Sequence, residues 1–136
     1  PTTNTVSDIA DSARFPNVAK VNSNIAAEYI FPPMEFGEIQ TRVSYSYRSK
    51  VFFYPNDAVN PYQQQVSSPA TNTVDARIAL ADIPLGVRLR GEIAAIGENL
   101  LNEDQVLYGI DFGALGFGGK FYSEPRRFAV QFKLNY

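Results

Sequence analysis

The sequence predicts an all-β protein, an antiparallel meander of about five strands. Apolar and polar side chains alternate with a two-residue period, which is the spacing of the two faces of a β-strand. The composition agrees, because the 136 residues include 10 Phe and 8 Tyr among many Val, Thr and Ile, which favour strands. Connections that contain Pro and Gly separate the alternating segments, as turns separate strands.

The alternation occurs in five segments along the chain. It is weaker in residues 24–31 and longest in residues 38–53. Residues 73–81, 87–98 and 128–136 repeat it, and the last of these is the most regular. In every segment after the first, the charged residues all share one parity. Each predicted strand therefore has one apolar face and one ionic face, apart from Phe52 and Ile96, which fall on the ionic side.

The connections between these segments alternate between short and long. Residues 32–37 and 82–86 are short and contain Pro and Gly, whereas residues 54–72 and about 99–122 are long. In an antiparallel meander this order places all short turns at one end of the strands and all long loops at the other. Such an asymmetry is typical of outer-membrane β-barrels.

Aromatic residues gather near the two ends of the predicted strands. Two aromatic levels with an aliphatic band between them are what the two interfaces of a membrane select. The pattern therefore favours a transmembrane β-barrel over a water-soluble sheet, in which the apolar face would pack against a second layer. One level comprises Tyr45, Tyr47, Phe52, Phe53 and Tyr54, and the other comprises Tyr29, Phe31, Phe36 and Tyr136.

Charge and composition exclude several classes of function. The chain has 12 Lys and Arg against 14 Asp and Glu, a net charge of −2, so we expect no nucleic-acid partner. It has no Cys and no His, which removes disulfides, thiolate catalysis and the usual zinc ligands. Residues 102–104 lack a regular calcium-ligand spacing, and we assign no metal and no cofactor. The glycine-rich residues 109–119 lack a nucleotide-binding context, and we expect a mobile or strand-extending loop there.

The end of the chain carries a recognisable motif. Residues 124–128 read Glu-Pro-Arg-Arg-Phe and lead into an alternating strand that ends on an aromatic residue. This closing segment resembles the C-terminal strand of TonB-dependent outer-membrane receptors. Residues 15–20, 45–50 and 99–103 are similar to segments upstream of that strand in the same family. Ala129, where Gly is usual, and the terminal Tyr136 in place of Phe are departures from the family pattern.

The resemblance implies a barrel of about 22 strands with an N-terminal plug in its lumen. Residues 1–136 would then be the C-terminal segment of that barrel, or one chain of a split barrel, without the plug, in the outer membrane of a Gram-negative bacterium. The implied function is TonB-dependent uptake of a scarce solute, such as a siderophore, a vitamin or a saccharide, without enzymatic chemistry. The implied partners are the remaining strands and the plug, TonB, the barrel-assembly machinery, and lipid and lipopolysaccharide.

Three sets of residues are candidates for function under this interpretation. The candidates for the lumen wall are Arg42, Arg48, Lys50, Asp75, Arg77, Arg88, Arg90, Glu92 and Glu98. The candidates for ligand contacts in an extracellular loop are Tyr54, Asn56, Asp57, Tyr62 and Gln63. The candidates for the C-terminal assembly signal are Phe128, Val130, Phe132, Leu134 and Tyr136.

Plainer alternatives stay open for each set. The charged face is also consistent with a solvated, charge-balanced wall, and the polar loop with an ordinary surface loop. The C-terminal set is consistent with a strand that simply closes the sheet. A soluble sheet acting as a binding or carbohydrate-active module is an alternative, with Glu92 and Glu98 as its carboxylates. Six positions apart on one strand, those two stand about 20 Å apart by strand rise, which is too far for a glycosidase pair. A passive porin is a further alternative.

Overall fold

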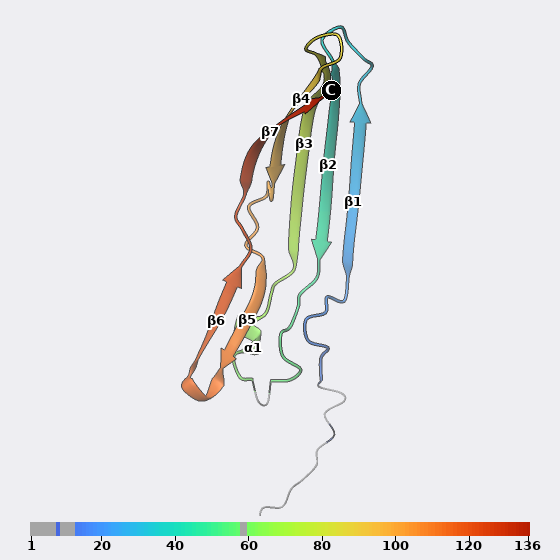
Figure 1. Ribbon diagram of the computed structural model, residues 1–136. Coiled ribbons are helices and arrows are strands. Elements are labelled where there is room, and N and C mark those ends of the chain that lie inside the picture. Colours follow the sequence, from blue (N-terminus) through green and yellow to red (C-terminus); the bar gives the residue numbers. More distant parts are fainter. Residues whose placement is uncertain (1–7, 9–12, 58–59) are drawn as a thin grey trace, which may run out of the picture. The chain divides into compact units, whose positions relative to one another are not determined.

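The structure is a computed structural model that describes residues 8, 13–57 and 60–136. Over these residues the chain forms seven strands, one short α-helix and one short 3-10 helix (Figure 1). The chain divides into two compact units. We call the first the sheet unit, and it comprises Val21–Ser49, Ala70–Asp104 and Ser123–Tyr136. The second, the loop unit, comprises Pro1–Lys20, Lys50–Pro69 and Gln105–Tyr122.

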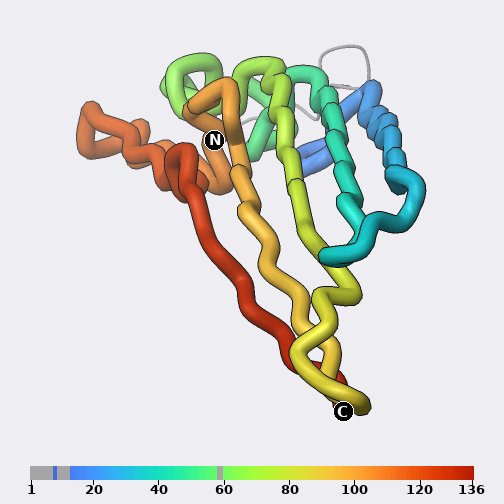
Figure 2. The backbone as a smooth tube through the Cα atoms, turned by 90° about the horizontal axis from the view of Figure 1, so that it is seen from above, coloured from blue at the N-terminus to red at the C-terminus, as the bar shows by residue number. Residues whose placement is uncertain are grey.

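The sheet unit is built on five antiparallel strands, as the alternation predicts. They are β1 (Asn22–Ile30), β2 (Glu38–Arg48), β3 (Thr71–Pro84), β4 (Arg90–Glu98) and β7 (Arg127–Asn135). Their order in the sheet is β1-β2-β3-β4-β7, and each neighbouring pair is antiparallel. Figure 2 shows these strands following one another as a single layer. The prediction of an antiparallel meander is therefore confirmed.

The register places the predicted apolar residues of all five strands on one face. One row across the sheet runs through Ala27, Val43, Ala76, Gly97 and Phe128. Because side chains alternate between faces, each neighbouring row presents the opposite face. A slip of one residue in any strand would move its whole apolar set to the ionic face, so the alternation specifies the register.

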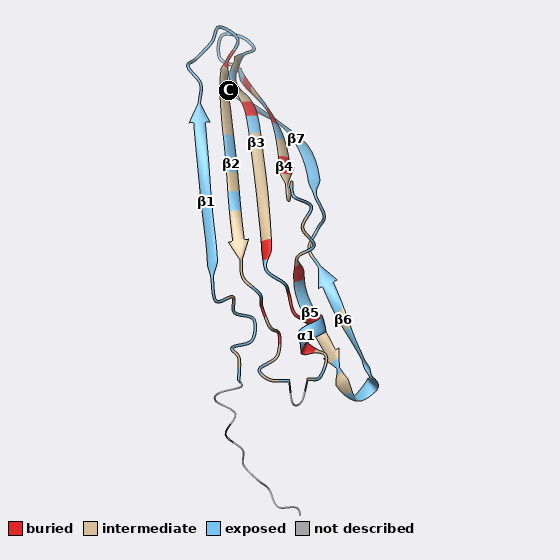
Figure 3. Cartoon of the chain, turned by 180° about the vertical axis from the view of Figure 1, so that it is seen from behind, coloured by how far each residue is buried: buried red, intermediate tan, exposed pale blue. Residues whose placement is uncertain are grey.

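The apolar face of this sheet is uncovered. The exposed fractions of Val43, Ile78 and Phe132 are 50%, 54% and 74%, and Figure 3 shows β1 and β7 exposed along their length. The described residues of the sheet unit include no second sheet and no helix that could pack on it. On the ionic face, Ala79 and Ala94 are buried.

The ends of the strands differ from the predicted ends. β2 stops at Arg48, so residues 49–53 are not part of it, and Val51 instead forms an isolated bridge with Ser68 in the loop unit. β3 continues to Pro84 because an irregularity between Leu80 and Ile83 inserts an extra residue. A β-bulge of this kind bends a strand without ending it. The turn therefore covers residues 85–89, rather than 82–86, and β4 begins only at Arg90.

The loop unit contains structure that the sequence did not predict. Residues 99–122 were expected to be a long loop, but β5 (Val106–Phe112) and β6 (Phe117–Tyr122) form an antiparallel hairpin within them. The 3-10 helix η1 (Gly113–Leu115) joins the two strands. The short helix α1 (Gln63–Val66) lies against both strands. No helix in the described part of the chain is long and apolar enough to span a membrane.

The glycines at residues 109–119 belong to this hairpin, in agreement with the strand-extending alternative of the sequence analysis. A Cβ at Gly109 would lie 2.3 Å from the carbonyl oxygen of Val66 and 2.9 Å from Cδ2 of Phe53, so only Gly allows β5 to approach these residues. Gly116 has φ +78, in the left-handed region that Gly adopts at the end of a helix. The buried core beside the hairpin consists of Val51, Phe53 and Val106.

Candidate functional site

The ionic face of the sheet is held by cross-strand ion pairs. Arg42 on β2 lies directly opposite Glu28 on β1, and its Nη1 is 3.7 Å from the Glu28 carboxylate. Arg77 on β3 donates to Glu92 on β4. These pairs tie neighbouring strands together on the side of the sheet where the sequence places the charged residues.

Arg127 and its partners were missed by the sequence analysis. Arg127 on β7 donates to Glu98, which lies directly opposite it on β4, and also to Glu124. Arg127 has an odd number, like the other ionic positions of β7, and this alternation could have identified it as a residue of the ionic face.

A polar hollow of about 170 Å³ lies within the ionic face. Asp75 at its wall accepts a hydrogen bond of 2.8 Å from the backbone N–H of Asn99. The hollow brings two guanidinium groups and two carboxylates together, and each of the four is engaged in an ion pair or hydrogen bond within the chain. Its lining residues are Arg42, Ser44, Asp75, Ala76, Arg77, Ile96 and Glu98.

Seven of the nine candidates for the lumen wall lie on the strands at ionic positions. By register, the seven on the ionic face are Arg42, Arg48, Asp75, Arg77, Arg90, Glu92 and Glu98. Two others do not. Lys50 lies beyond β2 in the loop unit, and Arg88 lies in the exposed turn before β4.

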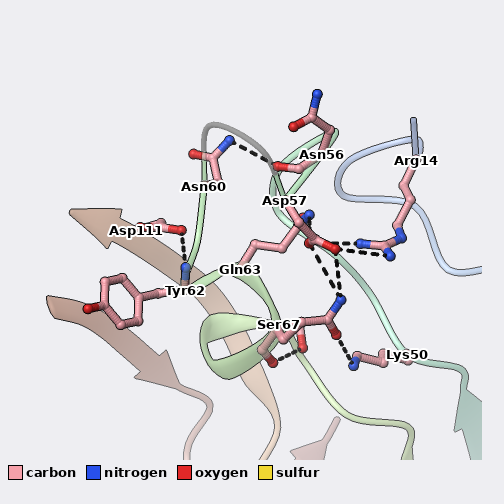
Figure 4. Close-up of polar contacts among 10 residues, drawn as sticks. Arg14, Lys50, Asn56, Asp57, Asn60, Tyr62, Gln63, Ser67 and Asp111 are labelled. Carbon is pink, nitrogen blue, oxygen red and sulfur yellow. Dashed lines mark hydrogen bonds and ion pairs between the residues drawn. The ribbon is translucent and has the colours of Figure 1, made fainter. Parts of the chain in front are cut away.

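Two of the five loop candidates, Asp57 and Gln63, meet at the carboxylate of Asp57. Figure 4 shows that carboxylate facing Arg14, whose Nη1 is 3.1 Å from Oδ1, and the amide nitrogen of Gln63, which also donates to Oδ1. The amide of Gln64 lies 3.5 Å from both carboxylate oxygens. These hydrogen bonds, that of Gln63 first and that of Arg14 next, lower the pKa of Asp57. We call Arg14, Asp57, Gln63 and Gln64 the Asp57 cluster.

The two predicted ligand-binding tyrosines serve the hairpin. The backbone N–H of Asp111 on β5 donates to the Tyr54 hydroxyl at 2.9 Å. The Asp111 carboxylate in turn accepts a 2.8 Å bond from the backbone N–H of Tyr62. The Asn60 side chain donates to the Asn56 carbonyl at 3.4 Å. The arrangement thus braces the segment 50–69 against β5, a role that the sequence analysis did not assign to these residues.

Two buried oxygens in this region have no hydrogen-bond partner among the described residues. They are Oε1 of Gln63 and Oδ1 of Asp111. Nearby, the Phe52 ring lies 4.3 Å from the Arg14 guanidinium and 4.7 Å from the Lys50 ammonium. Both are cation–π distances. Lys50 also donates to Oε1 of Gln64 at 3.1 Å, so it belongs to the loop unit and not to the ionic face of the sheet.

The candidates for the assembly signal lie together on the last strand. Phe128, Val130, Phe132 and Leu134 occupy the apolar face of β7 and are exposed, and Tyr136 follows the strand. β7 pairs only with β4 within the described sheet, so its outer edge is open. An open edge with one apolar face is able to add a further strand.

Groups of three or more metal-ligating side chains do not occur in the described part of the chain. The cluster at residues 102–104 is part of a turn, in which the Asn99 amide nitrogen donates to the carbonyl of Glu103 at 3.0 Å. No family model matches the chain, and comparison with curated proteins and with solved structures also gives no match.

Proposed function

We propose that this chain forms part of the wall of a TonB-dependent outer-membrane receptor, with its apolar face toward lipid and its ionic face toward the lumen. The observation that carries the proposal is the uncovered apolar face, which spans all five strands. Burial of one Val, Leu, Ile or Phe side chain is worth about 1.5–3 kcal/mol, so a face of this size needs a cover. Its exposed residues include Ile25, Tyr29, Val43, Tyr45, Ile78, Ile93, Phe128, Val130, Phe132 and Leu134.

The dimensions of the strands support a membrane span. The five strands are 9 to 14 residues long, and a tilted transmembrane strand needs about 9–11 residues. The short connections 31–37 and 85–89 leave from one end of the sheet, and the long connections leave from the other. In an outer-membrane barrel these ends face the periplasm and the exterior, respectively.

The open edges of the sheet also favour a barrel. β1 and β7 each have only one neighbour in the described sheet, and an exposed edge in water is a site of aggregation. Closure into a barrel removes both edges. The sheet holds an odd number of strands, five, so β1 and β7 run in the same direction. An antiparallel barrel of about 22 strands would then need about 17 more.

The receptor assignment itself rests on the resemblance of residues 121–136 to the last strand of TonB-dependent receptors. Binding by the external loops and plug would be followed by a TonB-driven change in the plug, and the proposal includes no bond-making step. The hydrogen-bonded Asp57 cluster favours a bracing role for Asp57 and Gln63 over direct ligand contact. The soluble carbohydrate-active alternative is less well supported, because Glu92 and Glu98 pair with Arg77 and Arg127.

The test uses the full-length protein in cells that contain or lack TonB. We expect the protein to fractionate with the outer membrane, to require detergent for extraction, and to migrate differently on gels before and after heating. Solute uptake or growth on a scarce nutrient should require TonB. Uptake that persists without TonB indicates a passive porin, and protein that is soluble without detergent contradicts the membrane assignment.

A further inference from the structure

We propose that the register of β7 on β4 is fixed by two contacts at the end where β4 stops and β7 begins. They are the ion pair of Arg127 with Glu98 and the packing of Phe128 over Gly97. We call these four residues the register lock. The lock concerns the pairing of two strands within this chain, and only its consequence for a closed barrel rests on the proposed function.

Alternation specifies the register of a strand pair only to within two residues. If β7 moved by two positions along β4, every side chain would stay on its own face of the sheet, because successive side chains alternate between faces. The observed pairing is nevertheless a single register that is regular along both strands. Contacts between particular side chains must therefore distinguish it from the two registers that lie two residues to either side.

The ionic half of the register lock is at the first residue of β7. The Arg127 guanidinium donates to Glu98, which lies directly opposite on β4, and to Glu124. Glu124 precedes β7 and moves with Arg127 in a slip, so it orients the guanidinium, whereas Glu98 marks one position along β4. Among the described residues, the pair of Arg127 with Glu98 is the one ion pair that joins β4 to β7.

The steric half of the register lock is an aromatic ring that fits over a glycine. Phe128 lies opposite Gly97 on the apolar face. A Cβ at Gly97 would lie 3.3 Å from Cε1 and 3.4 Å from Cδ1 of Phe128, so the ring lies against the space that a side chain would fill. A slip of two residues would place the ring opposite Ala95 or Asn99, and neither is a glycine. Of the three registers, only the observed one has this fit.

Both slipped registers lose the two contacts, and one of them also opposes two cations. In the first slip, Arg127 lies opposite Ile96. Lys133 then lies opposite Arg90, and like charges directly opposite each other destabilise a strand pair. In the second slip, Arg127 passes the end of β4 and lies level with Leu100. The second slip brings no like charges together, so it is the stronger competitor of the observed register when the lock is removed.

The register of each strand pair contributes to the dimensions of a closed barrel. The tilt of the strands, the shear and the diameter of a barrel are linked, and the shear is the sum of the registers around it. A slip between β4 and β7 would therefore change the shear. Under the proposed function, the register lock fixes the contribution of this strand pair to the width of the lumen.

The experiment measures the register by disulfide cross-linking of the full-length protein in detergent micelles. The 136 residues contain no Cys, and a disulfide requires Cα atoms within about 7 Å of each other, so each introduced pair of Cys reports one register. Cys at Ala94 and Gln131 reports the observed register. Cys at Ala94 and Ala129 reports the first slip, and Cys at Ile96 and Gln131 reports the second.

The test variant Arg127→Gln/Phe128→Ala removes both halves of the register lock. The matched control is Arg126→Gln/Phe132→Ala. Arg126 is adjacent and forms no ion pair among the described residues, and the exposed fraction of Phe132 is 74%, against 73% for Phe128. The backbone N–H of Arg126 donates to the Asn102 side chain at 3.2 Å. This hydrogen bond persists in both variants, so we expect a mixture of registers in the test variant and not a complete slip.

We expect the test variant to raise the ratio of the second-slip cross-link to the observed-register cross-link by about fivefold or more, since an exposed ion pair alone accounts for up to about that factor. The control should keep the wild-type ratio. The inference is overturned if the two variants give the same ratio. It is also overturned if all three cross-links fall together, because the contacts would then stabilise the pair without selecting its register. These cross-links form in a membrane or in water, so their outcome is separate from the extraction and uptake tests of the proposed function.

Discussion

The two faces of β7 provide a sharp test of what surrounds the sheet. Val130 lies on the apolar face and Gln131 on the ionic face, near the middle of the strand, and both are exposed in the chain. In water, Val130→Arg and Gln131→Arg would each change stability by no more than about 0.5 kcal/mol, as surface substitutions usually do. In a bilayer, Arg at a lipid-facing position near the midplane costs roughly 2–4 kcal/mol, whereas Arg facing the lumen remains hydrated.

The assay is equilibrium folding of the full-length protein into phospholipid vesicles, with the folded fraction measured by heat-modifiable migration across a denaturant series. We expect Val130→Arg to lower the equilibrium constant for folding by about 30-fold to 700-fold, at 1.4 kcal/mol per factor of ten. Gln131→Arg should stay close to the wild type. Equal effects of the two substitutions would refute the assignment of the apolar face to lipid.

Two further predictions concern the loop unit. Gly109→Ala should destabilise the hairpin and expose it to protease, because the added Cβ would lie 2.3 Å from the Val66 carbonyl oxygen. The control Gly119→Ala places its Cβ in open space and should leave protease cleavage unchanged. Equal cleavage of the two variants would contradict this packing. Because the pKa of Asp57 is lowered, the carboxylate should stabilise the Asp57 cluster at pH values above about 4, the ordinary pKa of Asp, and lose that contribution as the pH falls through its lowered pKa. Acid-protease cleavage of residues 50–69 should therefore rise at low pH in the wild type. The variant Asp57→Asn should be cleaved readily at every pH. Equal cleavage of the wild type and Asp57→Asn above pH 4 would contradict the role of Asp57.

The faces of the sheet were predictable because alternation is a local signal. In β7 every second residue is apolar, and a slip by one residue would move the apolar side chains to the opposite face of the sheet. The pattern alone therefore specifies which residues share a face. Ile96 was correctly placed on the ionic face, where it lies opposite Arg77 and Ala129. The alternating lengths of the connections likewise predicted that the short turns lie at one end of the sheet and the long connections at the other.

The loop unit was not predictable because its contacts join residues that are distant in sequence. Arg14 and Asp57 are 43 positions apart, and no local pattern marks them as partners. Alternation continued through residues 49–53, yet the bridge between Val51 and Ser68 diverts the chain from β2. The β5–β6 hairpin was hidden because its glycines, of which Gly109 and Gly118 pack closely on Val66, interrupt the alternation that identifies a strand.

Spin labels on β2 test most directly whether lipid covers the apolar face of the sheet. The segment has no Cys, so single Cys substitutions at Val43, Ser44, Tyr45 and Ser46 can carry spin labels in the full-length protein reconstituted in bilayers. We expect labels at Val43 and Tyr45 to collide preferentially with oxygen, which concentrates in hydrocarbon, and labels at Ser44 and Ser46 to collide with a water-soluble nickel chelate. If labels at Val43 and Tyr45 collide mainly with the chelate, or are shielded from both reagents, then lipid does not cover this face.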